Sequence, residues 1–414
     1  MVKSRSYKVT FIACMLGIFN QAAVCNITAL LFVPFMNLYG FGLWQLGVLI
    51  GVNFCSQLLA DLILTAKIET ISYRKMSIMA LILASSGLII FALVSPLMAR
   101  WGSGAVFASM AIATVIFSFS GGMLEVLVTP ITHSIPDSKS KSGAVALMHS
   151  FYAWGQVITI IVTALFIALV GEVYWPIIAG FWAVPAIVGI FLFCICPIAQ
   201  SKSNGEQKSE SKEKPSHKFT PYLVIAMIAI FTAGGTEMIM NQYVSTFCTI
   251  SLGFSKTISD LVGMCLFAVM MGIGRTTYGI LGDRLDMHAV LISGSIASCG
   301  CYIVVGLVPN AIAGLICCIA CGLFASLLWP GTLVIAGKRF TTNSAWVFAV
   351  LAISGDLGGS IIPSTMGVLA DFAGLNIAFA LFSIVPLVCF IANLILRRKD
   401  KKDGIGKLLP AEKE

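Results

Sequence analysis

The sequence predicts an all-α integral membrane protein, with twelve transmembrane helices arranged in two six-helix bundles. The first reason is composition: of 414 residues, 58% are hydrophobic and 11% are charged, whereas globular proteins average about 25% charged residues. The second is that apolar stretches long enough to cross a bilayer, roughly 20 residues each, follow one another along the chain. The third is one long hydrophilic interruption, residues 201–219, near the middle.

The apolar stretches place the twelve spans. The expected ranges are 9–36, 43–66, 74–97, 103–133, 142–170, 175–197, 220–249, 256–280, 287–308, 310–336, 344–370 and 375–396. The first stretch is longer than the about 7–15-residue core of a signal peptide, and no A-x-A site follows it. We therefore interpret it as a retained first span.

The hydrophilic interruption divides the chain into two halves. It has mixed charge and almost no apolar residue, a composition that predicts disorder. The expected domains are an N-terminal six-helix bundle (1–197), a disordered cytoplasmic linker (198–219), a C-terminal six-helix bundle (220–397) and a basic cytoplasmic tail (398–414).

Lysine and arginine predict the orientation of the spans. Of the 26 such residues, only Arg100 and Lys256 fall on one side and Arg275 falls inside a span; all others fall on the opposite side. Positive residues accumulate in cytoplasmic loops, so both termini are expected in the cytoplasm of a multi-pass cell-membrane protein. The net charge of +8 is an orientation feature and needs no nucleic-acid partner.

The two halves are related to each other in sequence. A shift of 200 residues pairs Gly122 with Gly322 and Pro130 with Pro330 without a gap. Parallel repeats of six spans, related by an axis along the membrane normal, are a transporter architecture.

The loop after the eighth expected span resembles a known family. Residues 279–288, GILGDRLDMH, are similar to the G-x-L-x-D-R motif of the major facilitator superfamily, with Asp283 and Arg284 in the acidic and basic positions. The resemblance covers essentially the whole chain. It implies a fold of two bundles and a gating role for both charged residues, which would lock the cytoplasmic face closed in one state.

Four further stretches resemble the fucose permease-like sugar porters within that superfamily. They are GGMLEVLVTP (121–130), ALMHSFYAWGQ (146–156), SLLWPGT (326–332) and SGDLGGSIIPSTMGVLAD (354–371). In that branch a span-four glutamate is implicated in proton coupling, and Glu125 matches it by position. One departure is Leu30, four residues before Pro34, where fucose permease has an acidic residue. Coupling would therefore rest on Glu125 alone, shift to another acid, or be absent.

Four carboxylates lie within the expected spans: Asp61, Glu125, Glu237 and Asp356. An ionisable group at the bilayer centre costs at least about 2.5–3.5 kcal/mol and generally faces the protein interior or a water-filled cavity. These residues are therefore the candidates for substrate binding, proton coupling or gating.

Glu125 stands alone in a stretch from Gly102 to Thr132 that has no other charged residue. In the next span His149, Tyr152 and Gln156 recur at i, i+3 and i+7, which places them on one helix face. An acid, an imidazole, a phenol and an amide on neighbouring helices would bind hydroxyl-rich solutes and supply a titratable group. The alternative is that Glu125 only pins two helices together.

Glu237 follows Gly234 and Gly235, and Asn241 lies one turn beyond it on the same face. The two glycines are expected to let this span bend or open, as discontinuous transporter helices do. Glu237 and Asn241 are therefore binding or coupling candidates, and the alternative is a purely structural polar pair.

Asp356 lies about midway along the eleventh span and pairs with Gln156 in the 200-residue repeat. The two residues are expected at similar depth, facing one central cavity. Asp356 would bind a substrate amine, serve as a second proton site, or form a salt bridge to Arg275. Arg275 and Asp61 lie near one end of their spans and are expected to act in gating or as scaffold.

The thiols are interpreted as packing residues. Cys317, Cys318 and Cys321 include a C-x-x-C spacing, but no histidine or second cysteine pair stands near them in the sequence. Buried free cysteine behaves as a small hydrophobe. We therefore expect no metal and no cofactor.

These observations predict a monomeric secondary transporter that moves a small polar solute, a sugar, by alternating access and with proton coupling through Glu125. An efflux antiporter for organic cations or drugs is the first alternative, since acids in both halves suit cations. A membrane nutrient sensor that does not transport is the second. The sequence lacks a Walker A loop, a nucleophile elbow and an H-E-x-x-H motif, so an enzyme or an ATP-driven pump is not expected.

Overall fold

The computed structural model describes residues 7–67, 71–135, 141–198, 219–281, 285–340 and 344–404. Asp283, Arg284 and almost all of the expected linker lie outside the described residues. So do the side chains of residues 141–147, 149–150, 279 and 344–345, and with them that of His149.

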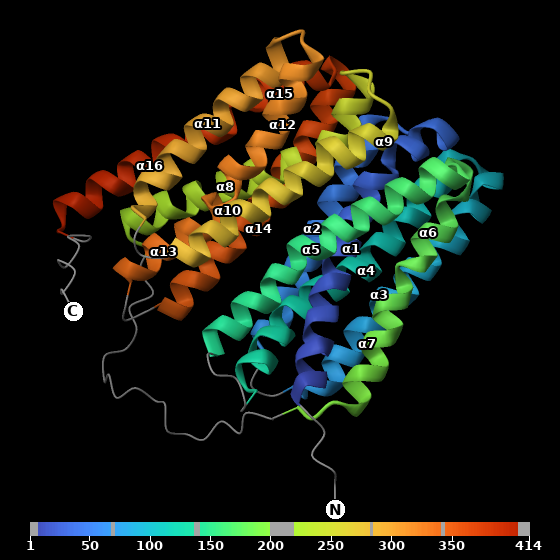
Figure 1. Ribbon diagram of the computed structural model, residues 1–414, viewed down its shortest axis with the longest axis horizontal. Coiled ribbons are helices and arrows are strands. Elements are labelled where there is room, and N and C mark those ends of the chain that lie inside the picture. The colour runs from blue at the N-terminus through green and yellow to red at the C-terminus, as the bar shows by residue number, and fades with distance from the viewer. Residues whose placement is uncertain are drawn as a thin grey trace, which may run out of the picture.

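Every regular element among the described residues is a helix (Figure 1). In chain order they are α1 (Tyr7–Tyr39), α2 (Leu43–Thr65), α3 (Tyr73–Leu97), η1 (Met98–Trp101), α4 (Ser103–His133), α5 (Lys141–Val170), η2 (Glu172–Tyr174), α6 (Trp175–Phe181), α7 (Ala183–Ile195), α8 (Pro221–Ile250), α9 (Lys256–Ile258), η3 (Ser259–Met264), α10 (Cys265–Leu281), α11 (Met287–Leu307), α12 (Ala311–Ala325), α13 (Leu328–Arg339), α14 (Ser344–Ala373), α15 (Leu375–Phe382) and α16 (Ile384–Lys402).

These elements form 12 helical segments that are long and apolar enough to cross a membrane. They coincide with the twelve expected spans, so the predicted fold class is confirmed. Several boundaries shift by a few residues, most at α16, which continues to Lys402. The first residues of the range predicted as a tail are therefore helical.

Two spans are interrupted at equivalent places, and proline explains both breaks. Pro185 has no N–H to donate to the carbonyl of Phe181, where α6 ends, and Pro386 has none for Phe382, where α15 ends. Each helix restarts two residues later.

The Gly234–Gly235 pair does not open α8 as the sequence suggested, and the Gly121–Gly122 pair does not open α4. Both α4 and α8 are continuous through them. A Cβ on Gly234 would lie 2.3 Å from the carbonyl oxygen of Gly355, and one on Gly122 would lie 2.3 Å from that of Gln57. These glycines therefore allow close packing of α8 on α14 and of α4 on α2, as small residues do in membrane bundles.

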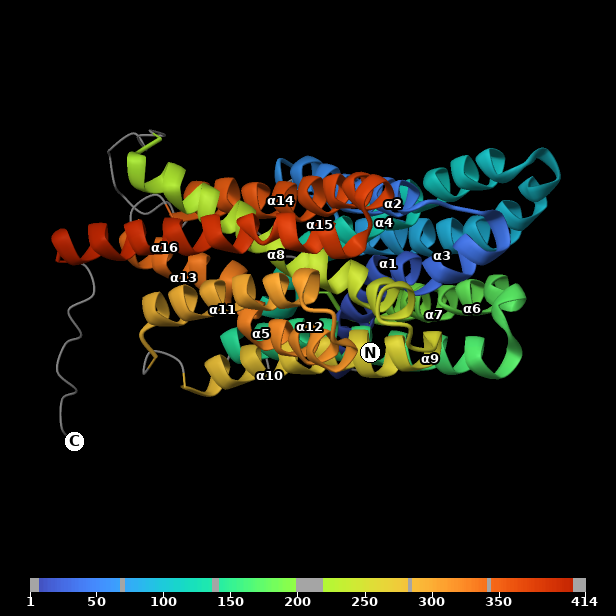
Figure 2. The ribbon, with the colours of Figure 1, turned by 90° about the horizontal axis from the view of Figure 1, so that it is seen from above.

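The elements from α1 to α7 form one bundle and those from α8 to α16 form the other (Figures 1 and 2). The bundles meet where α2 packs on α14, where α5 packs on α9, η3 and α10, and where α1 packs on α8. Figure 2 shows the first pair side by side at one edge of the molecule. We call the end that carries Tyr7, Ile198, Phe219 and Asp403 the termini side, and the opposite end the far side.

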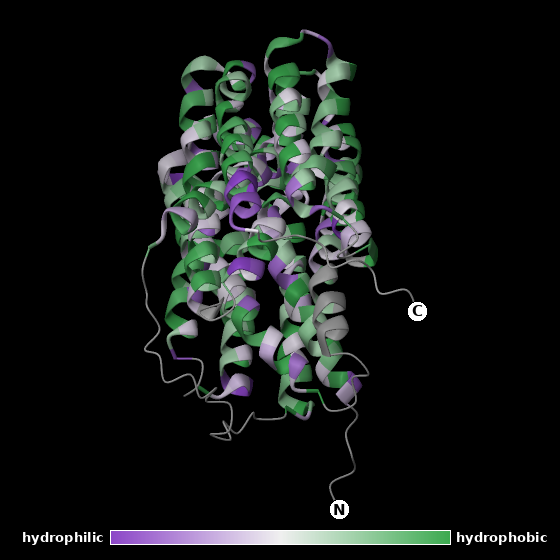
Figure 3. Cartoon of the chain, turned by 90° about the vertical axis from the view of Figure 1, so that its left-hand side faces the viewer, coloured by the Kyte–Doolittle hydropathy of each residue, from purple (hydrophilic) through white to green (hydrophobic). Residues whose placement is uncertain are grey.

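The apolar cores show where the bundles are joined. One core, which includes Phe35 and Met366, combines residues of both bundles toward the far side. On the termini side each bundle has its own core, represented by Val128 in the first and Leu223 in the second. The ribbons accordingly converge at the far side and diverge toward the termini side (Figure 1). Most of the helical ribbon is hydrophobic, and the hydrophilic stretches are short (Figure 3).

Candidate functional site

Glu125 is an exposed side chain on a helix whose neighbouring positions are buried. The outer face of α4 is marked by exposed Ile112 and Val115, and Glu125 is rotated from them by roughly 80–140° at 3.6 residues per turn. It points toward α1, where the Gln21 amide donates a hydrogen bond of 2.6 Å to its Oε2. Glu125 therefore does not lie on the apolar outer surface.

Asp61 lies beside Glu125, in the last turns of α2. Its Oδ1 is buried and has no hydrogen-bond partner among the described residues, and its charge interacts with those of Glu125 and Asp356. A Cβ on Gly122 would lie 2.8 Å from the same oxygen, so the glycine of α4 makes room for this carboxylate.

Asp356 brings an acid from the second bundle into the same region. It lies on α14, and its charge interacts with that of Glu125 across the boundary between the bundles. Within the part of the chain that the structure describes, no hydrogen bond or ion pair to Asp356 is present. The suggested salt bridge to Arg275 is not formed.

Arg275 binds Glu237 instead. Its NH2 group lies 2.7 Å from Oε1 of Glu237, and its Nε donates to the carbonyl of Ser326 at 3.2 Å. That carbonyl is free because Pro330, four residues later, has no N–H to give it. The break between α12 and α13 thus provides a second acceptor for the guanidinium. Glu237 therefore has a basic partner, unlike the other carboxylates described in this region.

Tyr152 lies between the two groups of acids. Its hydroxyl lies close to the Cys25 thiol, and the charges of both Glu125 and Glu237 act on it. Tyr152 of the predicted stripe on α5 is thus within electrostatic range of both carboxylates. His149 belongs to the same predicted stripe, and its side chain lies outside the description.

Gln156 and Asn241, predicted as binding residues, hydrogen-bond to each other. Gln156 Nε2 donates to Asn241 Oδ1 at 2.6 Å, and Asn241 Nδ2 donates to Oδ1 of Asn26 at 3.3 Å. Gln242 donates to the carbonyl of Cys25 at 3.3 Å. These amides are 0–2% exposed. They close the space between α1, α5 and α8 on the far side of the carboxylates.

Three polar residues were not identified from the sequence. Gln21 on α1 binds Glu125, and no sequence pattern singled it out. Asp260 is 2% exposed and paired with Lys256 four residues earlier, a spacing that places two side chains together on a helix. Asp371 contacts α2 of the other bundle, and no local pattern indicates a partner 328 residues away.

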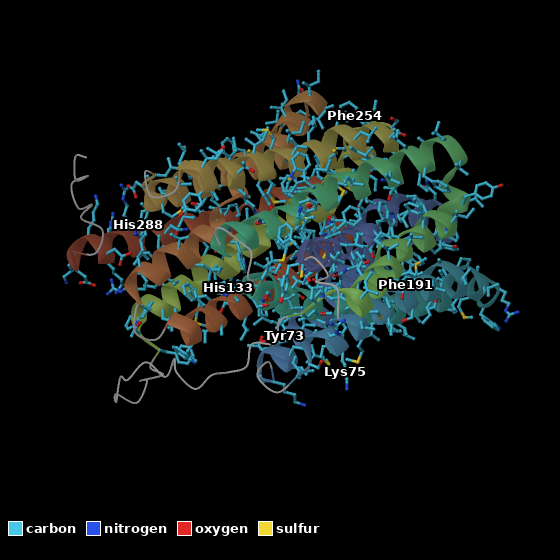
Figure 4. All side chains as sticks on the ribbon, turned by 60° about the horizontal axis from the view of Figure 1, so that its bottom comes forward. Tyr73, Lys75, His133, Phe191, Phe254 and His288 are labelled. Atoms are coloured by element: carbon cyan, nitrogen blue, oxygen red, sulfur yellow. The ribbon has the colours of Figure 1, made fainter. Side chains whose placement is uncertain are left out.

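Other titratable and aromatic residues lie away from this region. His133 and His288 occupy the termini-side ends of α4 and α11 (Figure 4), and His288 Nε2 lies 3.0 Å from Asp400. Trp154 is 60% exposed and, two residues from both Tyr152 and Gln156, lies on the opposite face of α5. It is therefore on the lipid side.

The arrangement combines several chemistries at the middle of the spans. Carboxylates accept hydrogen bonds and exchange protons, amides and a phenol both donate and accept, and one guanidinium is already neutralised. Among the described residues no group of three or more His, Cys, Asp or Glu side chains has the geometry to hold a metal ion. The carboxylates, the amides and the phenol together suit a small solute rich in hydroxyl groups.

Comparisons with known proteins agree on the family and the fold. A sequence model of the Major Facilitator Superfamily matches residues 9–274 and 226–411. An uncharacterized MFS-type transporter of Yersinia pestis is 22% identical over 284 residues, 68% of this chain and 70% of that protein.

Two solved structures illustrate the similarity in three dimensions. The Escherichia coli fucose:proton symporter FucP in an outward conformation aligns with a TM-score of 0.62 at 17% identity, over 95% of this chain and 99% of that one. The Escherichia coli xylose transporter XylE in a partially occluded inward-open conformation aligns with a TM-score of 0.72 at 12% identity, over 95% and 98%.

Proposed function

Because this chain belongs to the major facilitator superfamily, a family of transporters, we propose that it moves a small polar solute, a sugar, by alternating access with proton coupling. The two bundles would rock about the carboxylates and amides at mid-span. The solute would reach these groups first from one side of the membrane and then from the other.

The packing of the bundles supports a state open toward the termini side. One core joins the bundles on the far side, while each keeps a separate core on the termini side. With both termini cytoplasmic, as the lysine and arginine distribution predicts, the carboxylates would face the cytoplasm of a monomeric cell-membrane transporter.

Recognition of a sugar is supported by the residue types at mid-span. Tyr152 and Glu237 offer a hydroxyl and a carboxylate, and the amides of Gln156 and Asn241 become free to bind when the bundles separate. Similarity to transporters of fucose and xylose adds to this choice. The substrate would then carry several hydroxyl groups within the reach of both bundles.

Proton coupling rests on one observation, the environment of Glu125. Its carboxylate is exposed between the bundles, bound by a neutral amide and in electrostatic range of Asp61 and Asp356. Like charges at short range in a medium of low dielectric repel each other. A proton on Glu125 would relieve this repulsion and so favour movement of one bundle against the other.

The test is Glu125→Gln in proteoliposomes, with labelled hexoses, pentoses and amino sugars under an imposed pH gradient. Glutamine keeps an acceptor oxygen for Gln21 but exchanges no proton. Accumulation driven by the gradient should fall to the level of empty vesicles, while exchange of labelled for unlabelled sugar at equal pH is retained.

Glu172→Gln is the matched control for this test. Its carboxylate accepts a hydrogen bond from Asn37 at 3.0 Å within the first bundle, away from mid-span, and its substitution should leave accumulation unchanged. Unaltered accumulation in Glu125→Gln would remove Glu125 from the coupling mechanism.

An efflux antiporter for organic cations is the second candidate, and the charge of the site favours it. Asp61, Glu125 and Asp356 have no basic partner among the described residues. Competition binding of sugars against cationic dyes separates the two functions: displacement by sugars alone supports the sugar porter, and displacement by dyes alone supports the antiporter.

A further inference from the structure

We propose that Asp371 is a latch that holds the two bundles together on the far side. Asp371 lies near the end of α14 in the second bundle, and its Oδ1 accepts a hydrogen bond of 2.7 Å from the backbone N–H of Leu43. Leu43 is the first residue of α2 in the first bundle. One bundle therefore caps a helix of the other.

The start of α2 is suited to a carboxylate from outside the helix. The first N–H groups of a helix have no partner within it, and the partial positive charge there favours an anion. Gly42, the residue before α2, has no side chain to act as a cap. A Cβ at this position would lie 2.6 Å from Oδ1 of Asp371, so the glycine also leaves the space that the carboxylate occupies.

The latch stands at the outer end of a close contact between α2 and α14. A Cβ on Gly47 would lie 2.6 Å from the carbonyl oxygen of Ser364, and the Cys55 thiol lies 2.9 Å from the Ser360 hydroxyl. These contacts join small, uncharged groups. Asp371 adds a carboxyl side chain at the point where the two helices would first part.

The latch determines which conformation is populated, and this inference rests on the proposed rocking of the bundles. Opening the far side must separate α2 from α14 and so break the bond between Asp371 and Leu43. A bond present in one state only shifts the equilibrium by its differential free energy. Loss of the latch should therefore favour the state open to the far side.

The experiment is hydrogen–deuterium exchange of the full-length protein in proteoliposomes, comparing the wild type with Asp371→Ala and Gly42→Ala. An N-cap contributes about 1 kcal/mol, which corresponds to about a five-fold change in population. Exchange should rise about five-fold along both partners of the contact, residues 43–55 of α2 and 360–371 of α14. The double variant should equal either single variant, because each removes the same bond.

Glu172→Ala is the matched control, since it removes a far-side carboxylate that bonds within one bundle only. It should leave exchange in α2 and α14 at the wild-type level. Faster exchange confined to the first turn of α2, additive effects of the two substitutions, or an equal effect of Glu172→Ala would each overturn the latch. Failure of the proposed function is distinct: the wild type would then transport no sugar, whatever its exchange pattern.

Discussion

The two bundles hold their mid-span carboxylates in different ways. In the second bundle Glu237 is bound by the guanidinium of Arg275, which stays charged under all relevant conditions. In the first bundle Glu125 is bound by the neutral amide of Gln21. An ion pair fixes the charge of its carboxylate, whereas an amide does not. We therefore expect a change of charge at Glu125 and a fixed charge at Glu237.

The largest expected effect on transport comes from pairing Glu125 of the first bundle with a cation, as Glu237 of the second bundle is paired. Gln21→Lys places an ammonium group next to Glu125, as Arg275 is next to Glu237. A hydrogen bond to a charged group contributes about 1.5 kcal/mol or more. This free energy would favour the ionised form of Glu125 over its protonated form about ten-fold. Accumulation of sugar under a pH gradient should fall about ten-fold or more in proteoliposomes.

Gln21→Met is the control for this substitution, because it removes the amide without adding charge. It should preserve most of the gradient-driven accumulation. If the lysine and methionine variants lose accumulation equally, the charge state of Glu125 does not control proton-coupled transport.

The next largest effect is on stability and comes from removing Arg275, the cation that pairs with Glu237 in the second bundle. Arg275→Met leaves Glu237 without a counter-ion and the Ser326 carbonyl without its donor. Breaking a buried pair costs about 3–5 kcal/mol, and we expect about 2–3 kcal/mol here because the Arg275 side chain is 36% exposed. The apparent unfolding temperature in detergent should fall accordingly. Adding Glu237→Gln should recover most of the loss, and no recovery would contradict the assignment of a fixed ion pair.

The smallest effect has the opposite sign. Asp356 is an acid of the second bundle without a basic partner among the described residues, and it experiences the charge of Glu125. Asp356→Asn removes that repulsion and should raise the free energy of unfolding by about 1 kcal/mol or less. The same thermal measurement checks it. A fall as large as that of Arg275→Met would show that Asp356 has a stabilising partner after all.

Local features of the sequence were sufficient for the spans and for most of the central residues. Hydropathy alone placed the twelve spans, because a bilayer requires about 20 apolar residues from each helix. Glu125 stood out for the same reason, as the charged residue of an apolar stretch. Tyr152 and Gln156 followed from helical spacing, which holds whatever surrounds the helix.

Pairings between helices were not predictable in the same way. The sequence suggested Asp356 as a partner of Arg275, whereas Arg275 pairs with Glu237. The choice between the two acids depends on how α8, α10 and α14 are rotated about their axes. Pro330 did contain information, since it frees the carbonyl of Ser326 that Arg275 then binds. The contact between Asp371 and Leu43 depends on how one bundle is placed on the other, which no local pattern encodes.

The glycine pairs show how one residue type has two uses. Glycine permits both a bend and a close approach, and the sequence of α8 alone does not choose between them. The glycines Gly355, Gly358 and Gly359 on α14 indicate the second use, because two small-residue faces pack closely against each other. The two stretches read together would have predicted packing.

The bonds between Gln156, Asn241 and Asn26 have an electrical consequence. These amides carry no net charge, so breaking their contacts moves no charge through the membrane field. A membrane voltage acts on charge at about 2.3 kcal/mol per elementary charge per 100 mV. Voltage therefore acts on this protein through its charged mid-span residues, the carboxylates and Arg275, and through any ion they bind. It does not affect the separation of the amides.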